Sequence, residues 1–272
     1  MIRIAVSTQL WDEELLGEGQ LRLVAESGFR ALEIFAAPGH FEWQDESYVG
    51  RVAAWVRALG LSVCSLHAPW APGQDIAAID GAQRRSSVES VKRAVDDLAL
   101  LDGRILVLHP GATLNRPEHR TRQLGYSRDS IAGISEYCAE RGIRIALENP
   151  PPYELGGDNR DLVTLYGHFA DDPTVQACFD TGHAQLSVEG VSFAGTVPKD
   201  ILLVHVSDNG GHRDDHRLPD ETGTVPWGEL FSLLRARGFG GCLMLEVTPP
   251  PGVSQILSHG RQWMNGASRE LS

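Results

Sequence analysis

Short apolar segments alternate with amphipathic segments along the chain. Eight of the apolar segments have the length and composition of buried parallel strands. These predicted strands are Ile2–Ser7, Ala31–Phe35, Leu61–Leu66, Arg104–Leu108, Arg144–Leu147, Val175–Phe179, Leu202–Val206 and Cys242–Val247. The intervening patterns predict helices at Leu21–Ser27, Ser47–Leu59, Ala82–Leu101, Arg128–Arg141, Asp161–Phe169 and Trp227–Arg237, with weaker patterns at Phe193–Val197 and Ser254–Met264.

Glycine marks the ends of several predicted helices. Gly28, Gly60, Gly142 and Gly238 each follow a helical pattern directly, at a position that favours the left-handed conformation. An eightfold alternation of strand and helix predicts an α/β protein with a (β/α)8 TIM barrel, with residues 1–272 as a single domain. A doubly wound open sheet is the alternative, but no G-x-G-x-x-G pattern follows the first strand.

Composition narrows the class of partner. The chain has 24 Lys and Arg against 36 Asp and Glu, so its formal net charge is −12. Because this charge repels phosphate backbones, we expect no nucleic-acid partner. No apolar run of membrane-spanning length and no signal peptide is present, so we expect no membrane partner. The dispersed cysteines, Cys64, Cys138, Cys178 and Cys242, are typical of reduced thiols in a cytoplasmic protein.

The sequence Cys178-Phe179-Asp180-Thr181-Gly182-His183 leads a buried strand directly into a carboxylate, a glycine turn and an imidazole. The carboxyl ends of parallel strands are where ligands bind in barrels and open α/β sheets. Asp and His together suit a divalent metal. In the alternative interpretation, the aspartate caps the next helix and the histidine lies on the surface.

Other predicted strands end in similar chemistry. Six of them carry a metal-ligand type of side chain at or near the end, namely His67, His109, Glu148, Asp180, His205 and Glu246. Strand ends converge at one mouth in a barrel, and so much carboxylate and imidazole in one cavity would repel itself or shift its pKa values unless a cation neutralises it. In the loop after the seventh strand, Asp214 and His216 are two residues apart, so they would face the same way. A solvated loop is the alternative there.

Aromatic side chains follow several strands at the same predicted mouth. They are Trp11, Phe35, Phe41, Trp43, Trp70 and Tyr153. Aromatic rings suit the apolar face of a sugar, although they would also plug the rim of a barrel. We therefore expect a small-molecule sugar or polyol substrate, with Trp11, Trp70 and His67 among its contacts.

The chain resembles the xylose-isomerase-like barrel superfamily over essentially its whole length. The resemblance is carried by Leu147-Glu148-Asn149, Phe179-Asp180-Thr181-Gly182-His183, His205-Val206-Ser207-Asp208 and Leu245-Glu246. This superfamily contains sugar isomerases and epimerases, inosose dehydratases, hydroxypyruvate isomerases and apurinic endonucleases of the endonuclease-IV type.

The resemblance implies two ligand sets. In the sugar-acting members, the matching residues hold one divalent metal, and here they are Glu148, Asp180, His205 and Glu246. The two glutamates there also transfer protons, while the positions of His183 and Arg213 contact substrate oxygens. In the endonucleases a zinc cluster uses a larger set, which reads here His67, His109, Glu148, Asp180, His183, His205, Asp214, His216 and Glu246. The acidic loop Thr8–Glu14 departs from the basic, glycine-rich loops that grip DNA in the endonucleases.

These features favour a metal-dependent isomerase or epimerase of a sugar or sugar derivative. One glutamate, Glu148 or Glu246, would remove a proton to give an enediolate, and the other would return it. The ligand set suits Mn²⁺, Zn²⁺, Co²⁺ or Mg²⁺. A dehydratase, a zinc-dependent apurinic endonuclease and a sugar-binding barrel without activity remain alternatives. The sequence also leaves open whether the chain forms a homo-oligomer.

Overall fold

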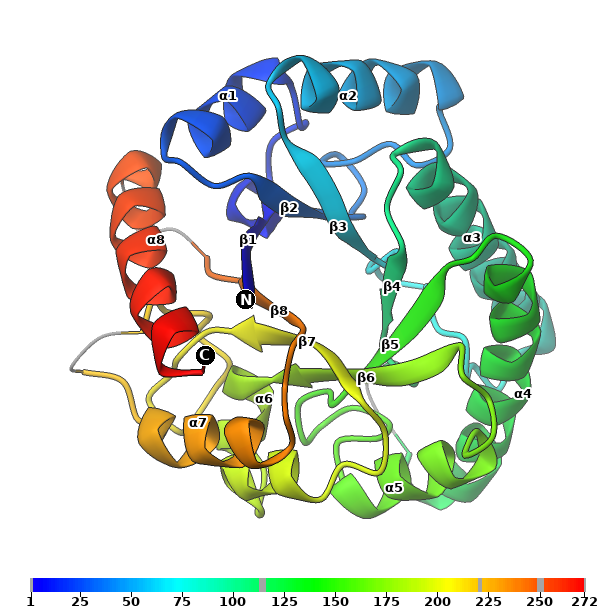
Figure 1. The fold of residues 1–272 in the computed structure, drawn as a ribbon. Helices are drawn as coiled ribbons and strands as arrows, with labels where there is room; N and C mark the ends of the chain where they lie inside the picture. Colours follow the sequence, from blue (N-terminus) through cyan, green and yellow to red (C-terminus); the bar gives the residue numbers. More distant parts are fainter. Residues whose placement is uncertain (1, 113–115, 220–221, 249–251, 272) are drawn as a thin grey trace.

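The computed structural model describes residues 2–112, 116–219, 222–248 and 252–271. Eight parallel strands close into a barrel in the order β1 to β8, and helices surround the barrel on the outside (Figure 1). β1 pairs with both β2 and β8, which completes the ring. The predicted (β/α)8 TIM barrel is confirmed.

The strands agree with the sequence pattern to within two residues at each end. They are β1 Arg3–Ser7, β2 Ala31–Phe35, β3 Ser62–His67, β4 Ile105–Leu108, β5 Arg144–Glu148, β6 Val175–Asp180, β7 Ile201–Val206 and β8 Cys242–Leu245. The α-helices are α1 Glu18–Glu26, α2 Glu46–Ala58, α3 Gly81–Leu100, α4 Arg120–Ala139, α5 Asn159–His168, α6 Thr181–Leu186, α7 Trp227–Ala236 and α8 Val253–Glu270. Three 3₁₀ helices among the described residues are η1 Thr8–Trp11, η2 Pro117–His119 and η3 Gly190–Gly195.

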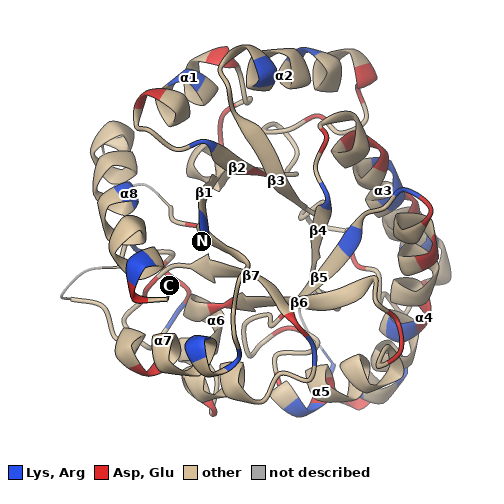
Figure 2. Cartoon of the chain, in the orientation of Figure 1, with Lys and Arg blue, Asp and Glu red and all other residues tan. Residues whose placement is uncertain are grey.

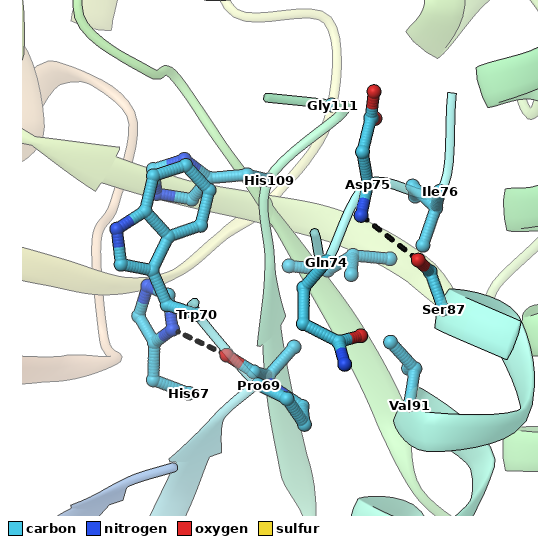
Figure 3. A pocket seen from close by; sticks show the side chains of 12 residues that line it. His67, Pro69, Trp70, Gln74, Asp75, Ile76, Ser87, Val91, His109 and Gly111 are labelled. Carbon is cyan, nitrogen blue, oxygen red and sulfur yellow. Dashed lines mark hydrogen bonds between the residues drawn. The ribbon is translucent and has the colours of Figure 1, made fainter. Parts of the chain in front are cut away.

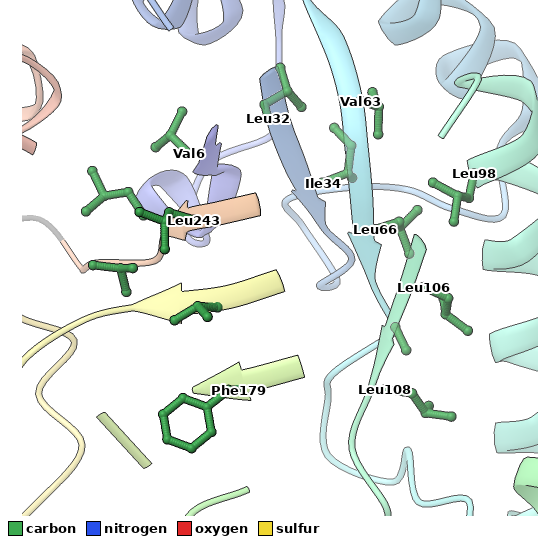
Figure 4. Close-up of a cluster of buried hydrophobic side chains, with 14 of the residues drawn as sticks. Val6, Leu32, Ile34, Val63, Leu66, Leu98, Leu106, Leu108, Phe179 and Leu243 are labelled. Atoms are coloured by element: carbon green, nitrogen blue, oxygen red, sulfur yellow. The ribbon is translucent and has the colours of Figure 1, made fainter. Parts of the chain in front are cut away.

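Side chains on each strand alternate between two apolar layers. Outward-facing residues such as Leu32, Ile34 and Leu66 pack against the helices, as Figure 4 shows. Inward-facing residues fill the barrel and are small or compact, among them Ala5 and Ala146. This alternation has a period of two, so a strand that is buried on both faces still directs each side chain to a defined layer.

The predicted helix-ending glycines have the expected backbone. Gly60 and Gly238 have φ values of +66° and +67°, and an added Cβ would meet no atom within 4 Å at either position. The left-handed conformation, not lack of space, therefore favours glycine there. Gly28 and Gly142 also have positive φ, at +91° and +63°.

Charged side chains lie mainly on the outer helices and the loops (Figure 2). None of the helices in the described ranges is long and apolar enough to span a bilayer.

Candidate active site

The carboxyl-end mouth of the barrel gathers acidic and histidine side chains because inward positions recur every second residue. The inward-facing Val107 is followed by His109, and Ala146 is followed by Glu148. Leu203 in turn precedes His205. The last inward position of each strand therefore carries the polar group, while the position below it carries an apolar one.

Four of the predicted ligands form one compact group. The four-residue group consists of Glu148, Asp180, His205 and Glu246, whose potential ligand atoms all lie within 4.8 Å of one another. His205 Nδ1 lies 2.8 Å from Glu246 Oε2 and 3.0 Å from Glu148 Oε1. The same nitrogen lies 3.9 Å from Asp180 Oδ2. All four residues are buried, with exposed fractions of 3 % or less.

Asp180 uses its two oxygens differently. Oδ1 accepts a hydrogen bond of 2.6 Å from the backbone N–H of His183 and so caps α6. Oδ2 is buried and has no hydrogen-bond partner among the described residues. The helix-capping interpretation is thus right for one oxygen, and the second oxygen remains available to a ligand.

The glycine in this segment has a different role from the one its sequence predicts. Gly182 lies in α6 and does not form a turn, so that interpretation is wrong. A Cβ on Gly182 would lie 2.5 Å from Ser207 Oγ and 3.1 Å from Asp214 Oδ1. Glycine is required here because the loop that carries Asp214 approaches the helix closely.

Asn149 ties the ends of two strands together. Its Nδ2 donates to the Asp180 carbonyl at 2.9 Å, and its Oδ1 accepts from the Asp180 N–H at 2.8 Å. The Asn149 carbonyl lies 2.9 Å from His183 Nδ1, which leaves Nε2 of that ring facing Asp214 Oδ2 at 3.0 Å. This residue therefore fixes the position of Asp180 and the orientation of the His183 ring.

Two further groups adjoin the four-residue group. His67, His109 and Glu148 form one of them, with His109 Nε2 3.2 Å from Glu148 Oε2. His183, Asp214 and His216 form the other, in which Asp214 Oδ2 lies 2.9 Å from His216 Nε2. The structure thus brings all nine residues of the larger predicted ligand set to one mouth. Glu148 is shared between two of these three groups, and it also belongs to a fourth group of potential ligands, with Cys178 and His205.

The donor set fits a divalent cation. Ligand atoms bound to one ion at about 2.0–2.2 Å lie roughly 3–3.5 Å from one another. The separations of 2.8 and 3.0 Å from His205 Nδ1 to the two glutamates are close to this range, and the 3.9 Å to Asp180 Oδ2 is longer. The partnerless Asp180 Oδ2 is an additional ligand of the hard type. Three carboxylates would otherwise be buried beside one another, which is unfavourable without a cation.

The pKa values of the three carboxyl groups in the four-residue group are shifted in opposite directions. Burial raises the pKa of Asp180 to about 7. Burial also disfavours ionisation of Glu246, but the adjacent His205 outweighs it and lowers the pKa of Glu246 to about 2. For Glu148, burial is likewise outweighed by His205 and His109, which hold its pKa well below the usual range.

The histidines compensate for this negative charge. Burial would lower the pKa of His109, but Glu148 and Glu154 raise it to about 10. For His183, Asp180 and Asp214 overcome burial and raise the pKa to about 10. Protons on these rings and a cation at the carboxylates neutralise the same charges, so metal binding at this mouth should compete with protons.

A cavity of about 280 Å³ opens above these groups. We call this space the site cavity. Its lining residues are Gln9, Phe35, His67, Trp70, His109, Glu148, Pro151, Tyr153, Glu154, His183, Asp214, His216 and Glu246. Trp70 lies over His109, with ring centroids 4.9 Å apart. The predicted contacts Trp70 and His67 therefore face the cavity, together with both predicted catalytic glutamates.

Other residues predicted at the mouth lie elsewhere. Trp11 is 6 % exposed and belongs to the main apolar core. The Arg213 side chain is 85 % exposed and is paired with Asp215, outside the site cavity. Phe41 and Trp43 are buried, and Trp43 donates from Nε1 to Ser90 of α3. Loop position alone did not reveal which way these side chains point.

A small cavity of about 30 Å³ lies behind the mouth and is shown in Figure 3. His67, Trp70 and His109 line both this space and the site cavity. His67 Nδ1 lies 3.0 Å from the Ala68 carbonyl, which fixes the ring with Nε2 toward Glu148. The volume suits one water molecule rather than a substrate.

The loop after β7 is held by Asp208 rather than by its metal-type residues. Asp208 Oδ1 accepts from the N–H groups of Thr224 and Val225, and its Oδ2 accepts from Trp227 Nε1. His216, farther along this loop, has φ +44°, which is uncommon for a non-glycine residue. Asp208 therefore ties the start of this loop to the segment before α7, and Asp214 and His216 lie between the two.

Two buried carboxylates at the mouth were not predicted as site residues. Glu33 lies in the middle of the apolar strand β2 and is fully buried. Glu154 lies 2.9 Å from His109 Nδ1 through its Oε2. A charged residue within a strand buried on both faces is an available signal for Glu33, whereas Glu154 lies in an irregular loop whose pattern gives no such signal.

The chain is thus a closed (β/α)8 barrel with acidic and histidine side chains gathered at its carboxyl-end mouth. The family model described as xylose isomerase-like TIM barrel matches residues 21–266. The chain therefore belongs to the xylose isomerase-like TIM barrel family, which confirms the predicted resemblance.

Curated relatives match over varying lengths. The chain is 27 % identical over 190 residues to protein MJ1311 of Methanocaldococcus jannaschii, covering 66 % of this chain and 63 % of that protein. It is 26 % identical over 246 residues to protein y4fM of Sinorhizobium fredii, covering 88 % of this chain and 73 % of that protein. The match thus spans less than two thirds of the length of MJ1311.

Solved structures share the fold at low sequence identity. A D-tagatose 3-epimerase-like protein has a TM-score of 0.85 at 22 % identity, covering 99 % of this chain and 98 % of the other. An L-ribulose 3-epimerase has a TM-score of 0.83 at 18 % identity, with coverages of 100 % and 96 %. The 3-keto-D-glucoside 4-epimerase YcjR of E. coli has a TM-score of 0.78 at 19 % identity, with coverages of 98 % and 100 %.

Proposed function

We propose that this chain is a metal-dependent isomerase or epimerase of a small sugar or sugar derivative. The observation that carries the proposal is the convergence of Glu148 and Glu246 on His205 Nδ1, at 3.0 and 2.8 Å, beside a cavity of about 280 Å³. Ligand sites in proteins have volumes from about 300 Å³ upward, so this cavity is at the small end of the range, which suits a monosaccharide. The structural similarity to a D-tagatose 3-epimerase-like protein and an L-ribulose 3-epimerase supports the same class of substrate.

Binding would use the polar and aromatic lining of the site cavity. His183 Nε2 lies 3.0 Å from Asp214 Oδ2, and in this proposal it would exchange that contact for a substrate oxygen. Trp70 and Phe35 offer flat apolar surfaces of the kind that stack on a sugar ring. Arg213 is kept as a predicted contact, although its side chain would have to leave Asp215 to reach the cavity.

A divalent ion held by the four-residue group would polarise a substrate carbonyl and acidify the neighbouring C–H. Glu246 has a pKa lowered to about 2, so it is ionised at neutral pH, which is the protonation state that a general base needs. Because a group with so low a pKa is a weak base, the bound ion would have to acidify the C–H for the transfer to occur. Glu148 is ionised for the same reason, since His205 and His109 keep its pKa low. One carboxylate removes the proton to give an enediolate and is protonated in the process. The same glutamate can return this proton at the new position, whereas return by the partner glutamate requires that the partner first takes a proton from solvent.

Product analysis tests the proposal. The protein, stripped of metal and reloaded with Mn²⁺ or Co²⁺, would be incubated with a panel of ketopentoses and ketohexoses in deuterated water and followed by NMR. We expect conversion to an epimer or aldose isomer with deuterium at the reacting carbon. Loss of water from the substrate would instead assign a dehydratase, and no conversion of any sugar in the panel would contradict the proposed class of reaction.

A second candidate is zinc-dependent hydrolysis of a phosphodiester. It is favoured by one observation, the three ligand groups that share or adjoin Glu148 and could hold more than one ion. Net charge and the acidic loop after β1 argue against DNA as the substrate. Metal content separates the two functions, because one ion per chain favours the sugar reaction and two or three zinc ions favour hydrolysis.

A further inference from the structure

Glu33 is a carboxylate inside the barrel, beneath the four-residue group. It lies at the middle of β2 between Leu32 and Ile34 and has an exposed fraction of 0 %. Its Oε2 accepts a hydrogen bond of 2.7 Å from Ser65 Oγ and lies 3.3 Å from His205 Nε2. Its Oε1 has no hydrogen-bond partner in the part of the chain that the structure describes. A buried carboxylate with so few partners is unfavourable for folding and calls for a functional reason.

The geometry of His205 supplies that reason. The two ring nitrogens face opposite ways, because Nδ1 points toward Glu148 and Glu246 while Nε2 points toward Glu33. An imidazole binds a metal through an unprotonated nitrogen, and a hydrogen bond made by the other nitrogen selects the tautomer. A carboxylate at Nε2 accepts the hydrogen bond from the Nε2–H. Nδ1 is then unprotonated, and its lone pair faces the four-residue group, where it can bind a metal.

We propose that Glu33 is a positioning residue that holds His205 in its Nε2–H form, with Nδ1 directed at a divalent cation. The inference rests on the metal-binding part of the proposed function. Ser65 contributes by fixing Glu33 Oε2 with its hydroxyl. A carboxyl oxygen that accepts the Nε2–H also makes the opposite ring nitrogen a better ligand for a metal.

Glu154 offers a comparison within the same mouth. It contacts Nδ1 of His109, whose Nε2 faces Glu148, so the roles of the two nitrogens are reversed relative to His205. If each carboxylate serves its own histidine, removal of Glu33 should weaken an ion at the four-residue group. Removal of Glu154 should affect only an ion at His67, His109 and Glu148.

The test measures metal affinity without substrate. Wild type, Glu33→Gln, Glu154→Gln and Asp97→Asn would be stripped with a chelator and titrated with Mn²⁺, with free Mn²⁺ followed by its EPR signal. For Glu33→Gln we expect the Kd of the tightest site to rise by about 10- to 100-fold, the usual effect of losing such a partner. Asp97→Asn is the matched control, since Asp97 is also a buried carboxylate with a partnerless oxygen but lies on α3, and its Kd should equal that of wild type.

A second readout reports the tautomer directly. In protein with ¹⁵N-labelled histidine, the His205 Nε2–H should be protected and shifted downfield in wild type, and Glu33→Gln should remove this signature. If Glu33→Gln does not fold, Ser65→Ala replaces it, because it deletes only the hydroxyl that fixes Glu33 and should weaken Mn²⁺ in the same direction by less. A stable Glu33→Gln protein with Mn²⁺ affinity within twofold of wild type would overturn the assignment.

The outcome is separable from the proposed reaction. If Glu33→Gln weakens Mn²⁺ but wild type converts no sugar, the role of Glu33 is supported and the isomerase proposal fails. If wild type has no Mn²⁺ site at all, the metal centre and the role of Glu33 both fail.

Discussion

The two halves of the barrel interior are formed by the same eight strands but have opposite chemistry. The amino-end half is apolar, with side chains such as Ala31, Ile105 and Ala146 in one buried cluster. About two residues farther along, roughly 7 Å at the rise of a strand, the inward positions carry carboxylates and imidazoles. The same strands continue through both halves, with register shifts between Leu32 and Glu33 and between Ala177 and Cys178, so the difference in chemistry resides in the side chains.

This contrast assigns different tasks to the two halves. Apolar packing in the amino-end half stabilises the barrel and fixes where each strand ends. The carboxyl-end half collects groups whose mutual repulsion opposes folding until a cation or protons neutralise it. Substitutions in one half should therefore change stability, and substitutions in the other should change metal binding and chemistry.

The largest expected effect is at Asp180. Asp180→Asn removes one carboxylate from the four-residue group, and we expect activity to fall by more than about 10³-fold, equivalent to roughly 4 kcal/mol or more. The metal content should fall with it, while the free energy of unfolding of the metal-free protein should not decrease by a comparable amount. Elemental analysis that finds full metal occupancy in this variant would break the assignment.

The amino-end half should respond in the opposite way. Ile105→Ala removes buried methyl groups from the inner cluster and should lower the free energy of unfolding by roughly 2–5 kcal/mol. Its affinity for Mn²⁺ should stay within about twofold of wild type, because the ligands sit farther along the strands. Ile105→Val is the matched control, with an expected loss of about 0.5–1.5 kcal/mol. Denaturant unfolding and metal titration on the same samples would show whether the two halves are independent.

A substitution at Glu246 separates two functions of the carboxyl-end half, proton transfer and substrate binding. In Glu246→Gln the carboxamide oxygen remains a weak ligand but cannot accept a carbon-bound proton at neutral pH. With metal restored, kcat should fall by roughly 10²-fold, and a substrate analogue should bind within about tenfold of wild type. Solvent-deuterium exchange at the substrate carbon is the measurement. Exchange at the wild-type rate would transfer the proton role to Glu148.

The strand pattern was sufficient to predict the barrel, because a run of apolar residues specifies a buried strand whatever its neighbours are. The same pattern placed His67, Glu148 and Asp180 at the mouth, since strand ends in a barrel converge. The helical patterns did not include α6, which has only six residues and follows the capping Asp180, so a helix there was considered only in the alternative interpretation of that aspartate. A helix this short has too few residues to show the periodicity of an amphipathic face.

Side-chain direction in irregular segments could not be predicted. Arg213 and Asp214 are neighbours, yet Asp214 faces the site cavity and Arg213 faces solvent. Glu33 is the opposite case, because its strand was predicted correctly but the partner that gives it a role, His205, lies 172 residues away in the sequence. Such contacts depend on tertiary packing, and a single sequence contains no direct signal for them.

The smallest expected effect concerns a buried carboxylate far from the mouth of the barrel. It tests whether burial alone is enough for an ionised carboxylate to lower the free energy of unfolding. Asp97 on α3 is 9 % exposed, and burial raises its pKa to about 7, helped by Asp96 and Glu46. A carboxyl group whose pKa is higher in the folded state than in the unfolded one favours folding when it is protonated. Its contribution is therefore complete below about pH 4 and is lost as the pH rises toward 7.

Asp97→Asn removes this dependence of the free energy of unfolding on pH. Allowing for screening by water at the partly accessible side chain, we expect it to raise the free energy of unfolding by roughly 1–2 kcal/mol at pH 8 and by close to zero at pH 4. Urea unfolding at the two pH values provides the measurement. Equal effects at both would show that Asp97 does not titrate in this range, and the penalty for buried carboxylates would then have to be sought at the mouth.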